Sequence, residues 1–183
     1  MSDDHVFCTW SYRKILPPGL NDRFRDLDHL IREIATNANY RLVIVAPYLS
    51  PLGMATLRDA IAVAAKRGAW IRLVTADLTD ENSLNHKAIY ELCRGSEGRL
   101  IQNHLRILSP TVALPALVHA KLIIADGSSG YMGSANMSSN ALDNNFEVGI
   151  SLSPIQADSL DRLVTYFESE GLFHDVTALF FSA

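Results

Sequence analysis

The residues best suited to chemistry lie within one short segment, "VHAKLIIADGSSGYMGSAN", which runs from Val118 to Asn136. His119 and Lys121 stand two residues apart inside an apolar run. Ser134 and Asn136 have the same spacing and follow a turn rich in glycine and serine. Side chains two residues apart in a strand point to the same face of a sheet. The spacing therefore predicts an imidazole, an ammonium, a hydroxyl and an amide on a common surface.

This set of groups suits the oxygens of a phosphoryl group. The ammonium supplies charge, the hydroxyl and amide supply neutral donors, and Gly133 lets the backbone approach a ligand closely. His119 is the one group of the set that can act as a nucleophile or proton carrier near neutral pH. Glu147 lies on the next predicted strand, where its carboxylate could bond the second imidazole nitrogen and fix the tautomer. The segment thus predicts phosphodiester chemistry.

The same segment is expected to form a strand with two different faces, followed by a hairpin turn over residues 126–130. His119 and Lys121 would lie on the chemical face. The alternate positions, expected to point into the core, are Val118, Ala120, Leu122 and Ile124. A plainer interpretation also stays open, in which the histidine and lysine belong to an ordinary solvated strand face and the serine and asparagine are turn residues.

The order of these residues matches a known family. The segment reads H-x-K-x4-D, then G-S-x-N after six intervening residues, and a glutamate follows 28 residues after the histidine. This pattern closely resembles the HKD motif of the phospholipase D superfamily in its extended form. Its positions are His119, Lys121, Asp126, Gly133, Ser134, Asn136 and Glu147. The resemblance covers about residues 115–152 strongly and residues 40–76 more weakly.

The resemblance implies a mechanism. Family members cleave phosphodiesters through a covalent phosphohistidine, without a metal or other cofactor. His119 would be the nucleophile in one subunit and the general acid and base in the other. Lys121, Ser134 and Asn136 would bind the phosphate oxygens. The two remaining members of the catalytic set are Glu147, which would orient His119, and Asp126, which closes the motif and suggests a structural role in the hairpin or dimer contact.

The resemblance also implies a homodimer. Two HKD motifs build one site in this family, because one histidine attacks phosphorus while the other protonates the leaving oxygen. The chain carries a single H-x-K pair. We therefore expect a twofold-symmetric pair whose axis passes through the site and brings both copies of His119 together.

The substrate is less defined than the reaction. Short chains with a single motif look most like the bacterial nuclease branch, so the expected function is a metal-independent nuclease, with DNA favoured over RNA. A helicase or an antiviral defence system is a partner suggested by analogy. The basic residues selected as DNA contacts are Arg13, Lys14, Arg94, Arg99 and Arg106. The alternatives are a phospholipase D-type lipid phosphodiesterase or phosphatidyltransferase, and a non-catalytic nucleic-acid-binding module.

Length and composition agree with one domain over residues 1–183, with a formal net charge of −4. The acidic opening "MSDDHVFCTW" and the lack of any apolar run of about 18 residues predict neither a signal peptide nor a membrane span, so the expected location is the cytoplasm. Cys8 and Cys93 stand in no metal-ligand spacing. No metal-binding motif is found.

The pattern of elements predicts an α/β fold with a mixed, largely parallel sheet flanked by helices on both faces. Residues 1–18 would form an N-terminal strand or arm, and residues 40–76 a first βαβ unit. Helical spacing indicates a helix from Leu20 to Ala38 and another from Ser83 to Cys93. Residues 94–117 look irregular apart from a short strand in "HLRIL". A capping box at Ser153 predicts a final helix.

Overall fold

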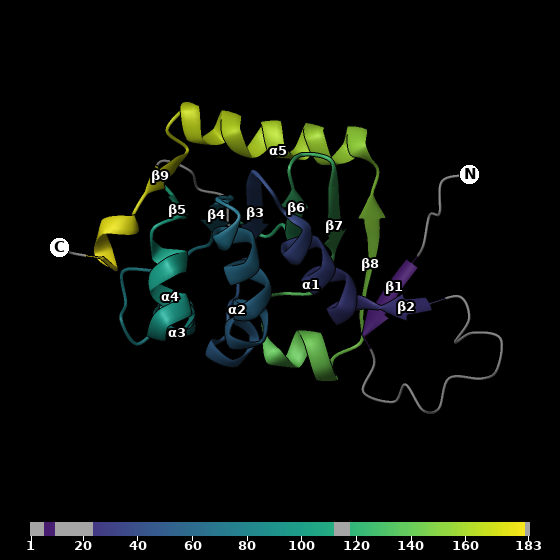
Figure 1. Cartoon of the computed structure of the whole chain (residues 1–183), viewed down its shortest axis with the longest axis horizontal. Helices are drawn as coiled ribbons and strands as arrows, with labels where there is room; N and C mark the ends of the chain where they lie inside the picture. Colours follow the sequence, from purple (N-terminus) through teal and green to yellow (C-terminus); the bar gives the residue numbers. More distant parts are fainter. Residues whose placement is uncertain (1–5, 10–23, 112–117, 182–183) are drawn as a thin grey trace.

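The computed structural model describes residues 6–9, 24–111 and 118–181 (Figure 1). Within these ranges one sheet carries nine strands in the order β2-β1-β8-β7-β6-β3-β4-β5-β9. The helices α1 to α4 contribute to one hydrophobic cluster, and α5 contributes to a second cluster on the opposite face. The expected α/β fold with helices on both faces is therefore confirmed.

The expected balance of strand directions is wrong. Three neighbouring pairs of the described strands, β1–β2, β3–β4 and β4–β5, are parallel, and the other five are antiparallel. The reason lies in the run of strands from β6 to β8. The short turn between β6 (Leu122–Ala125) and β7 (Ser129–Gly133) can only join antiparallel neighbours, whereas parallel strands need a long crossover.

The first βαβ unit is confirmed. It consists of β3 (Arg41–Val45), α2 (Pro51–Lys66) and β4 (Trp70–Val74), and the two strands pair in parallel. The Ser50 side chain caps α2 by accepting a hydrogen bond from the Gly53 N–H, and Pro51 follows at the first helical position. The chain leaves the helix through Gly68, whose φ of +91° favours glycine.

The N-terminal region differs from its expected form. The strand β1 (Val6–Thr9) is confirmed, and residues 10–23 lie outside the described residues. Residues Phe24–Asp26 form the strand β2, parallel to β1, rather than part of the helix. The helix α1 (Leu27–Asn37) begins later because the Asp26 carboxylate caps it by accepting from the His29 N–H.

The remaining elements complete the two layers. They are α3 (Leu84–Leu92), α4 (Gly95–Gln102), β5 (Leu105–Pro110), β8 (Glu147–Leu152), α5 (Pro154–Ser169) and β9 (Phe173–Asp175), with a π-helical turn at Asn140–Asn144 and a 3-10 turn at Thr177–Leu179. The capping box at Ser153 is confirmed. The helix α4 escaped sequence analysis because two of its eight residues are glycines, which disfavour helices.

Candidate active site

The two motif residues His119 and Lys121 lie at the end of a strand and not on one of its faces. The strand β6 begins only at Leu122, and Ala120, which was expected in the core, is exposed. Both faces of β6 are buried, because Leu122 packs in the cluster of α5 and Ile123 in the cluster of α1 to α4. The expected chemical face is therefore wrong, since a central strand with a helix layer on each side has no solvated face.

The position at the strand end still suits chemistry. The strand β6 runs antiparallel to β3, and Leu122 stands opposite Val45, the last residue of β3. His119 and Lys121 therefore lie at the edge of the sheet where the parallel strands β3 to β5 end. Open α/β sheets bind ligands at this edge.

Lys121 is a buried ammonium with unusual neighbours. Its Nζ donates to the backbone oxygen of His119 at 2.9 Å and lies 3.4 Å from Nδ1 of the His119 ring. Burial lowers the pKa of Lys121, and the negative charge of Glu147 opposes this shift. Among the ion pairs of the described residues, none includes Lys121. Its positive charge is available to an anion.

His119 is exposed and lies at an open pocket with a volume of about 490 Å³. The pocket is lined by His119, Ala120, Lys121, Leu122, Met132, Gly133 and Ser134. The structure thus brings together the histidine, the lysine and the serine of the motif. Sequence analysis missed Leu122 and Met132 as pocket residues. Leu122 stands directly opposite Met132 across β6 and β7, which places both side chains on one face of the sheet. Spacing along the chain does not reveal this pairing.

Glu147 contacts other partners than the one expected. Its Oε2 accepts a hydrogen bond from the Ser134 hydroxyl, and its Oε1 accepts one from the Asn145 amide at 3.1 Å. Ser134 also accepts a hydrogen bond from the Val148 N–H at 3.1 Å. In the described part of the chain, the His119 ring contacts Lys121 and not Glu147. The expected orientation of His119 by Glu147 within one chain is therefore not what the structure shows.

Gly133 allows the side chain of Tyr131 to pack closely against the backbone. A Cβ atom built on Gly133 would lie 2.2 Å from the Tyr131 hydroxyl oxygen, and one on Gly149 would lie 2.0 Å from the Tyr131 ring. Tyr131 is fully buried, and burial raises its pKa to about 12. Its hydroxyl accepts a hydrogen bond from the Ala135 N–H at 3.2 Å. Gly133 thus makes room for a tyrosine that holds the loop after β7, whereas we expected it to let the backbone approach the ligand.

Asn136 follows in this loop and is half-buried. Its Oδ1 is buried and has no hydrogen-bond partner in the described part of the chain. A buried amide oxygen without a partner costs free energy unless something else satisfies it. Asn136 thus has unused hydrogen-bonding capacity, and its contact with phosphate stays a prediction.

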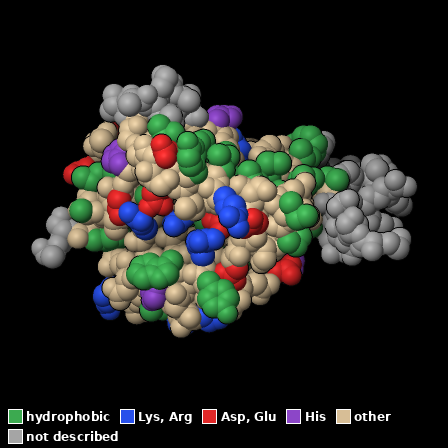
Figure 2. Space-filling view, turned by 90° about the horizontal axis from the view of Figure 1, so that it is seen from above, with side chains coloured by type: hydrophobic (Ala, Val, Ile, Leu, Met, Phe, Trp, Pro, Cys, Tyr) green, Lys and Arg blue, Asp and Glu red, His purple; other side chains and the backbone are tan. Residues whose placement is uncertain are grey.

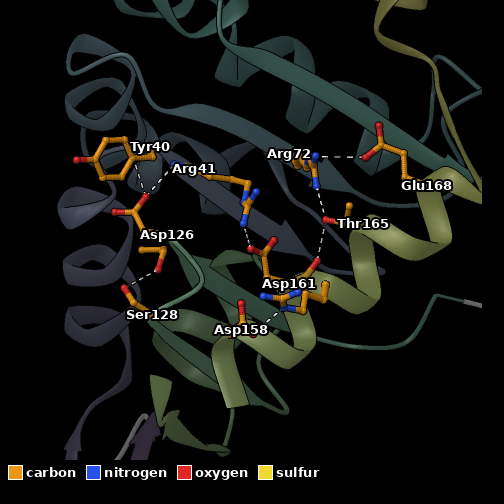
Figure 3. Close-up of polar contacts among 11 residues, drawn as sticks. Tyr40, Arg41, Arg72, Asp126, Ser128, Asp158, Asp161, Thr165 and Glu168 are labelled. Carbon is orange, nitrogen blue, oxygen red and sulfur yellow. Dashed lines mark hydrogen bonds and ion pairs between the residues drawn. The ribbon is translucent and has the colours of Figure 1, made fainter. Parts of the chain in front are cut away.

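Asp126 is remote from the pocket. It follows β6 at the opposite end of the strand from Lys121, about 16 Å away at the usual rise per residue. Its carboxylate accepts hydrogen bonds from the N–H groups of Tyr40 and Arg41, both at 2.8 Å (Figure 3), and from the Asn39 N–H at 3.0 Å. These bonds lower the pKa of Asp126 against the effect of burial, which would raise it. Asp126 therefore belongs to the hairpin, as its place in the motif suggested, and not to the group of side chains around the pocket.

Of the basic residues expected to contact DNA, the three that the structure describes, Arg94, Arg99 and Arg106, do not line the pocket. Arg106 pairs with Glu168 and Asp175, and Arg94 pairs with Glu91. Arg13 and Lys14 lie outside the described residues. Figure 2, which looks onto the molecule from above the view of Figure 1, shows basic and acidic side chains next to one another. Among the described residues that line the pocket, Lys121 is the only lysine or arginine.

The described residues lack two further features. No helix there is long and apolar enough to cross a membrane. No group of three or more His, Cys, Asp or Glu side chains there could hold a metal ion.

Comparison with known proteins places this geometry in a family. Residues 30–170 match the model of the "Cardiolipin synthase, PLD-like domain" family. A cardiolipin synthase of Geobacillus sp. (strain WCH70) is 25% identical over 154 residues, which are 84% of this chain and 28% of that protein. Cardiolipin synthase 2 of Bacillus cereus is 24% identical over 161 residues, 88% of this chain and 29% of that protein. The chain spans less than a third of the length of these curated relatives.

Solved structures show the same fold. Nuc from Salmonella typhimurium, described as a phospholipase D family member, aligns with a TM-score of 0.61 and 20% identity over 94% of this chain and 98% of that chain. NucT from Helicobacter pylori aligns with a TM-score of 0.60 and 19% identity over the same shares. Phosphatidylserine synthase of Haemophilus influenzae aligns with a TM-score of 0.61 and 16% identity over 84% of this chain and 37% of that chain. The motif, the fold and the matched family model agree, and the chain belongs to the PLD-like domain family of the phospholipase D superfamily.

Proposed function

We propose that the protein is a nuclease that cleaves phosphodiester bonds of nucleic acid, with DNA as the favoured substrate. The observation that carries this proposal is the pairing of the exposed His119 imidazole with Lys121, a buried lysine that forms no ion pair within the described residues. A buried cation of this kind is costly to keep and favours a ligand that is an anion. His119 beside it supplies the nucleophile, and the open pocket admits a polymer backbone.

The proposed reaction has two steps. In the first, an unprotonated nitrogen of His119 attacks phosphorus, the bond from phosphorus to the leaving oxygen breaks, and a second imidazolium gives that oxygen its proton. In the second, water attacks phosphorus and gives its proton to the second imidazole, and the bond from phosphorus to nitrogen breaks. Lys121 and Asn136 bind the phosphate oxygens throughout, and no metal takes part. The mechanism needs two imidazoles, because one cannot be nucleophile and acid in the same step.

A second copy of the chain is the proposed source of the second imidazole. Val6, Ile150 and Met132 stand directly opposite one another on β1, β8 and β7, and each is about 40% exposed. Val148 lies two residues before Ile150 on the same face and is equally exposed. Met132 belongs to this row and also lines the pocket of His119, so the row begins at the pocket. Exposed apolar rows beside an incomplete site favour a symmetric self-association.

A lipid substrate is the second candidate. The observation in its favour is that the curated relatives are cardiolipin synthases and that one structural neighbour is a phosphatidylserine synthase. In favour of the nuclease, this chain aligns in fold with almost the whole of the Nuc and NucT chains. The nuclease is therefore the better-supported proposal.

The deciding experiment compares the two substrates under the same conditions. Supercoiled plasmid and single-stranded DNA are incubated with the protein in EDTA, beside phosphatidylcholine vesicles. The expected result is nicking of DNA in EDTA, no release of choline, and no nicking by His119→Ala. Nicking only after Mg²⁺ is added would contradict the metal-free mechanism. Choline release without nicking would favour the lipid candidate. Full activity of His119→Ala would show that His119 is not the nucleophile.

A further inference from the structure

Asn85, near the start of α3, is a buried amide that joins the ends of two strands. It is 3% exposed. Its Nδ2 donates to the carbonyl oxygens of Pro47 and Ala76, both at 2.8 Å, and lies 3.2 Å from the Thr75 hydroxyl. Its Oδ1 accepts from the Leu49 N–H at 2.7 Å. The side chain therefore uses both its donor and its acceptor on backbone groups that follow β3 and β4.

These bonds fix the segment 46–50, which links β3 to α2. The β-sheet ladders of β3 end at Val45. Beyond that point, the Pro47 carbonyl and the Leu49 N–H bond to Asn85 instead. Buried backbone groups without partners would destabilise the fold, so the amide has a clear structural use. An aspartate of the same shape would lose the donor and place its charge against the carbonyl oxygens. Asn85 thus determines where segment 46–50 lies.

Segment 46–50 in turn holds the loop that carries Asn136. Leu49 pairs with Met137 in an isolated parallel bridge. The Ser50 N–H donates to the Met137 carbonyl oxygen at 3.1 Å, and the Ser139 N–H donates to the Ser50 hydroxyl at 3.1 Å. The bridge and the Ser139–Ser50 hydrogen bond therefore link segment 46–50 to the residues directly after Asn136.

The first turn of α2 presses on the same loop. A Cβ atom built on Gly53 would lie 2.6 Å from both the Met137 carbonyl oxygen and the Ser138 Cα. Real Cβ atoms do not approach backbone so closely, and only glycine allows this contact. The loop 135–139 thus rests directly against a helix whose N-cap is Ser50.

Asn136 depends on this support more than a side chain with its own partners would. Its Oδ1 has no hydrogen-bond partner in the part of the chain that is described. On one side, Ala135 is held by the Tyr131 hydroxyl, and on the other side Met137 is held by Leu49 and Ser50. The location of the amide is therefore determined by the backbone of its loop.

We propose that Asn85 is a positioning residue for the phosphodiester reaction, which acts through segment 46–50 and loop 135–139 to place the Asn136 amide at the phosphate. The inference rests on the proposed function only in taking Asn136 as a phosphate ligand. Asn85 lies on α3, outside the motif segment, and the proposal adds it to the residues that determine the geometry of the site.

A double-mutant cycle tests this role on bis(p-nitrophenyl) phosphate, a phosphodiester that is neither nucleic acid nor lipid. Asn85→Asp should lower kcat/KM about tenfold, the size of effect that coupled neighbours show. In a chain that already carries Asn136→Ala, the same substitution should change kcat/KM less than about twofold, because the amide it positions is gone. Equal losses in both backgrounds would overturn the proposal. Val164→Ala, a buried change in the other hydrophobic cluster, is the control for a general loss of stability.

Hydrogen exchange of backbone amides gives a readout that needs no activity. Asn85→Asp should speed exchange across residues 135–139 by about tenfold relative to the wild type, whereas Val164→Ala should leave that segment unchanged. Unchanged exchange in residues 135–139 of Asn85→Asp would overturn the inference even in an active enzyme. A wild-type protein that cleaves no phosphodiester would refute the proposed function, while the exchange experiment would still decide whether Asn85 holds the loop. Gly53→Ala, which displaces the same loop from α2, should reproduce the faster exchange if Asn85→Asp does not fold.

Discussion

The hydroxyl of Ser134 donates a hydrogen bond to the buried carboxylate of Glu147, thirteen residues further along the chain. Ser134 lines the pocket, and Glu147 is 8% exposed behind it. A carboxylate buried to this extent needs such donors, since an unsatisfied buried charge strongly destabilises a protein. The bond therefore joins β8 to the loop after β7 and sets the wall of the pocket.

Replacing Ser134 by alanine should destabilise the protein. Removal of one partner leaves the Glu147 Oε2 without its donor, which costs about 1–3 kcal/mol in the free energy of unfolding. Urea unfolding followed by circular dichroism measures this loss. The control is Ser159→Ala, since the exposed Ser159 hydroxyl donates only to the Ile155 carbonyl oxygen within α5. An equal loss in the free energy of unfolding for Ser134→Ala and Ser159→Ala would show that the bond to Glu147 stabilises the protein no more than the exposed bond within α5 does.

Lys121 should control the alkaline side of the pH–activity profile. Burial lowers its pKa, so the ammonium is lost at a lower pH than that of an ordinary lysine, about 10.4. The value of kcat/KM should fall as pH rises through this lowered pKa, because the charge that binds phosphate disappears. Lys121→Met should reduce kcat/KM about 100-fold or more, as loss of a donor at a developing charge does.

The arginine variant separates charge from shape. Lys121→Arg keeps a positive charge to about pH 12 or beyond, so any remaining activity should persist to higher pH than in the wild type. The measurement is kcat/KM on bis(p-nitrophenyl) phosphate between neutral and strongly alkaline pH. If kcat/KM of Lys121→Arg fell at the same alkaline pH as that of the wild type, the fall would come from the titration of another group.

Asp126 should contribute stability without contributing chemistry. Its carboxylate accepts three backbone N–H bonds that tie the β6–β7 turn to the loop before β3. Asp126→Ala should reduce the free energy of unfolding by about 1–3 kcal/mol, while the kcat of the folded fraction stays within about twofold of the wild type. A large fall in kcat without loss of stability would place Asp126 in the reaction after all.

The contribution of Asp126 should also depend on pH with a definite sign. Its pKa is lowered in the folded protein, so the folded state binds fewer protons than the unfolded state over the titration range. The added stability is present above the unfolded pKa of about 4 and is lost as pH falls through the folded value. The difference in unfolding free energy between wild type and Asp126→Ala should therefore shrink below about pH 4.

The exposed apolar row should be needed for self-association. Ile150 is 40% exposed at the centre of the row, and Ile155, at the start of α5, is 81% exposed and is not part of the row. Ile150→Lys should give a monomer by sedimentation and lower kcat/KM about 100-fold or more, because it would remove the second imidazole that we propose as the general acid. Ile155→Lys should leave both properties unchanged. A fully active wild-type monomer would contradict the shared site.

The local sequence predicts the structure correctly where neighbouring residues decide the outcome. The βαβ unit, the capping box at Ser153 and the strand after residue 146 follow from local periodicity and caps, and all are present. It failed at α4, where glycines obscured a helix, and at β2, where pairing with β1 overrides helical periodicity. Tertiary contacts outweigh weak local preferences at such positions.

The sequence alone determined the family, the sheet flanked by helices on both faces and the side chains available for phosphate chemistry, because spacing along the chain carries that information. It could not determine which of those side chains contact one another. Only the tertiary structure showed that Glu147 bonds Ser134 and Asn145, that Asp126 lies at the far end of β6, and that Asn85 bonds the backbone after β3 and β4. Such contacts depend on strand register and on the packing of loops distant in the chain, and residue spacing specifies neither.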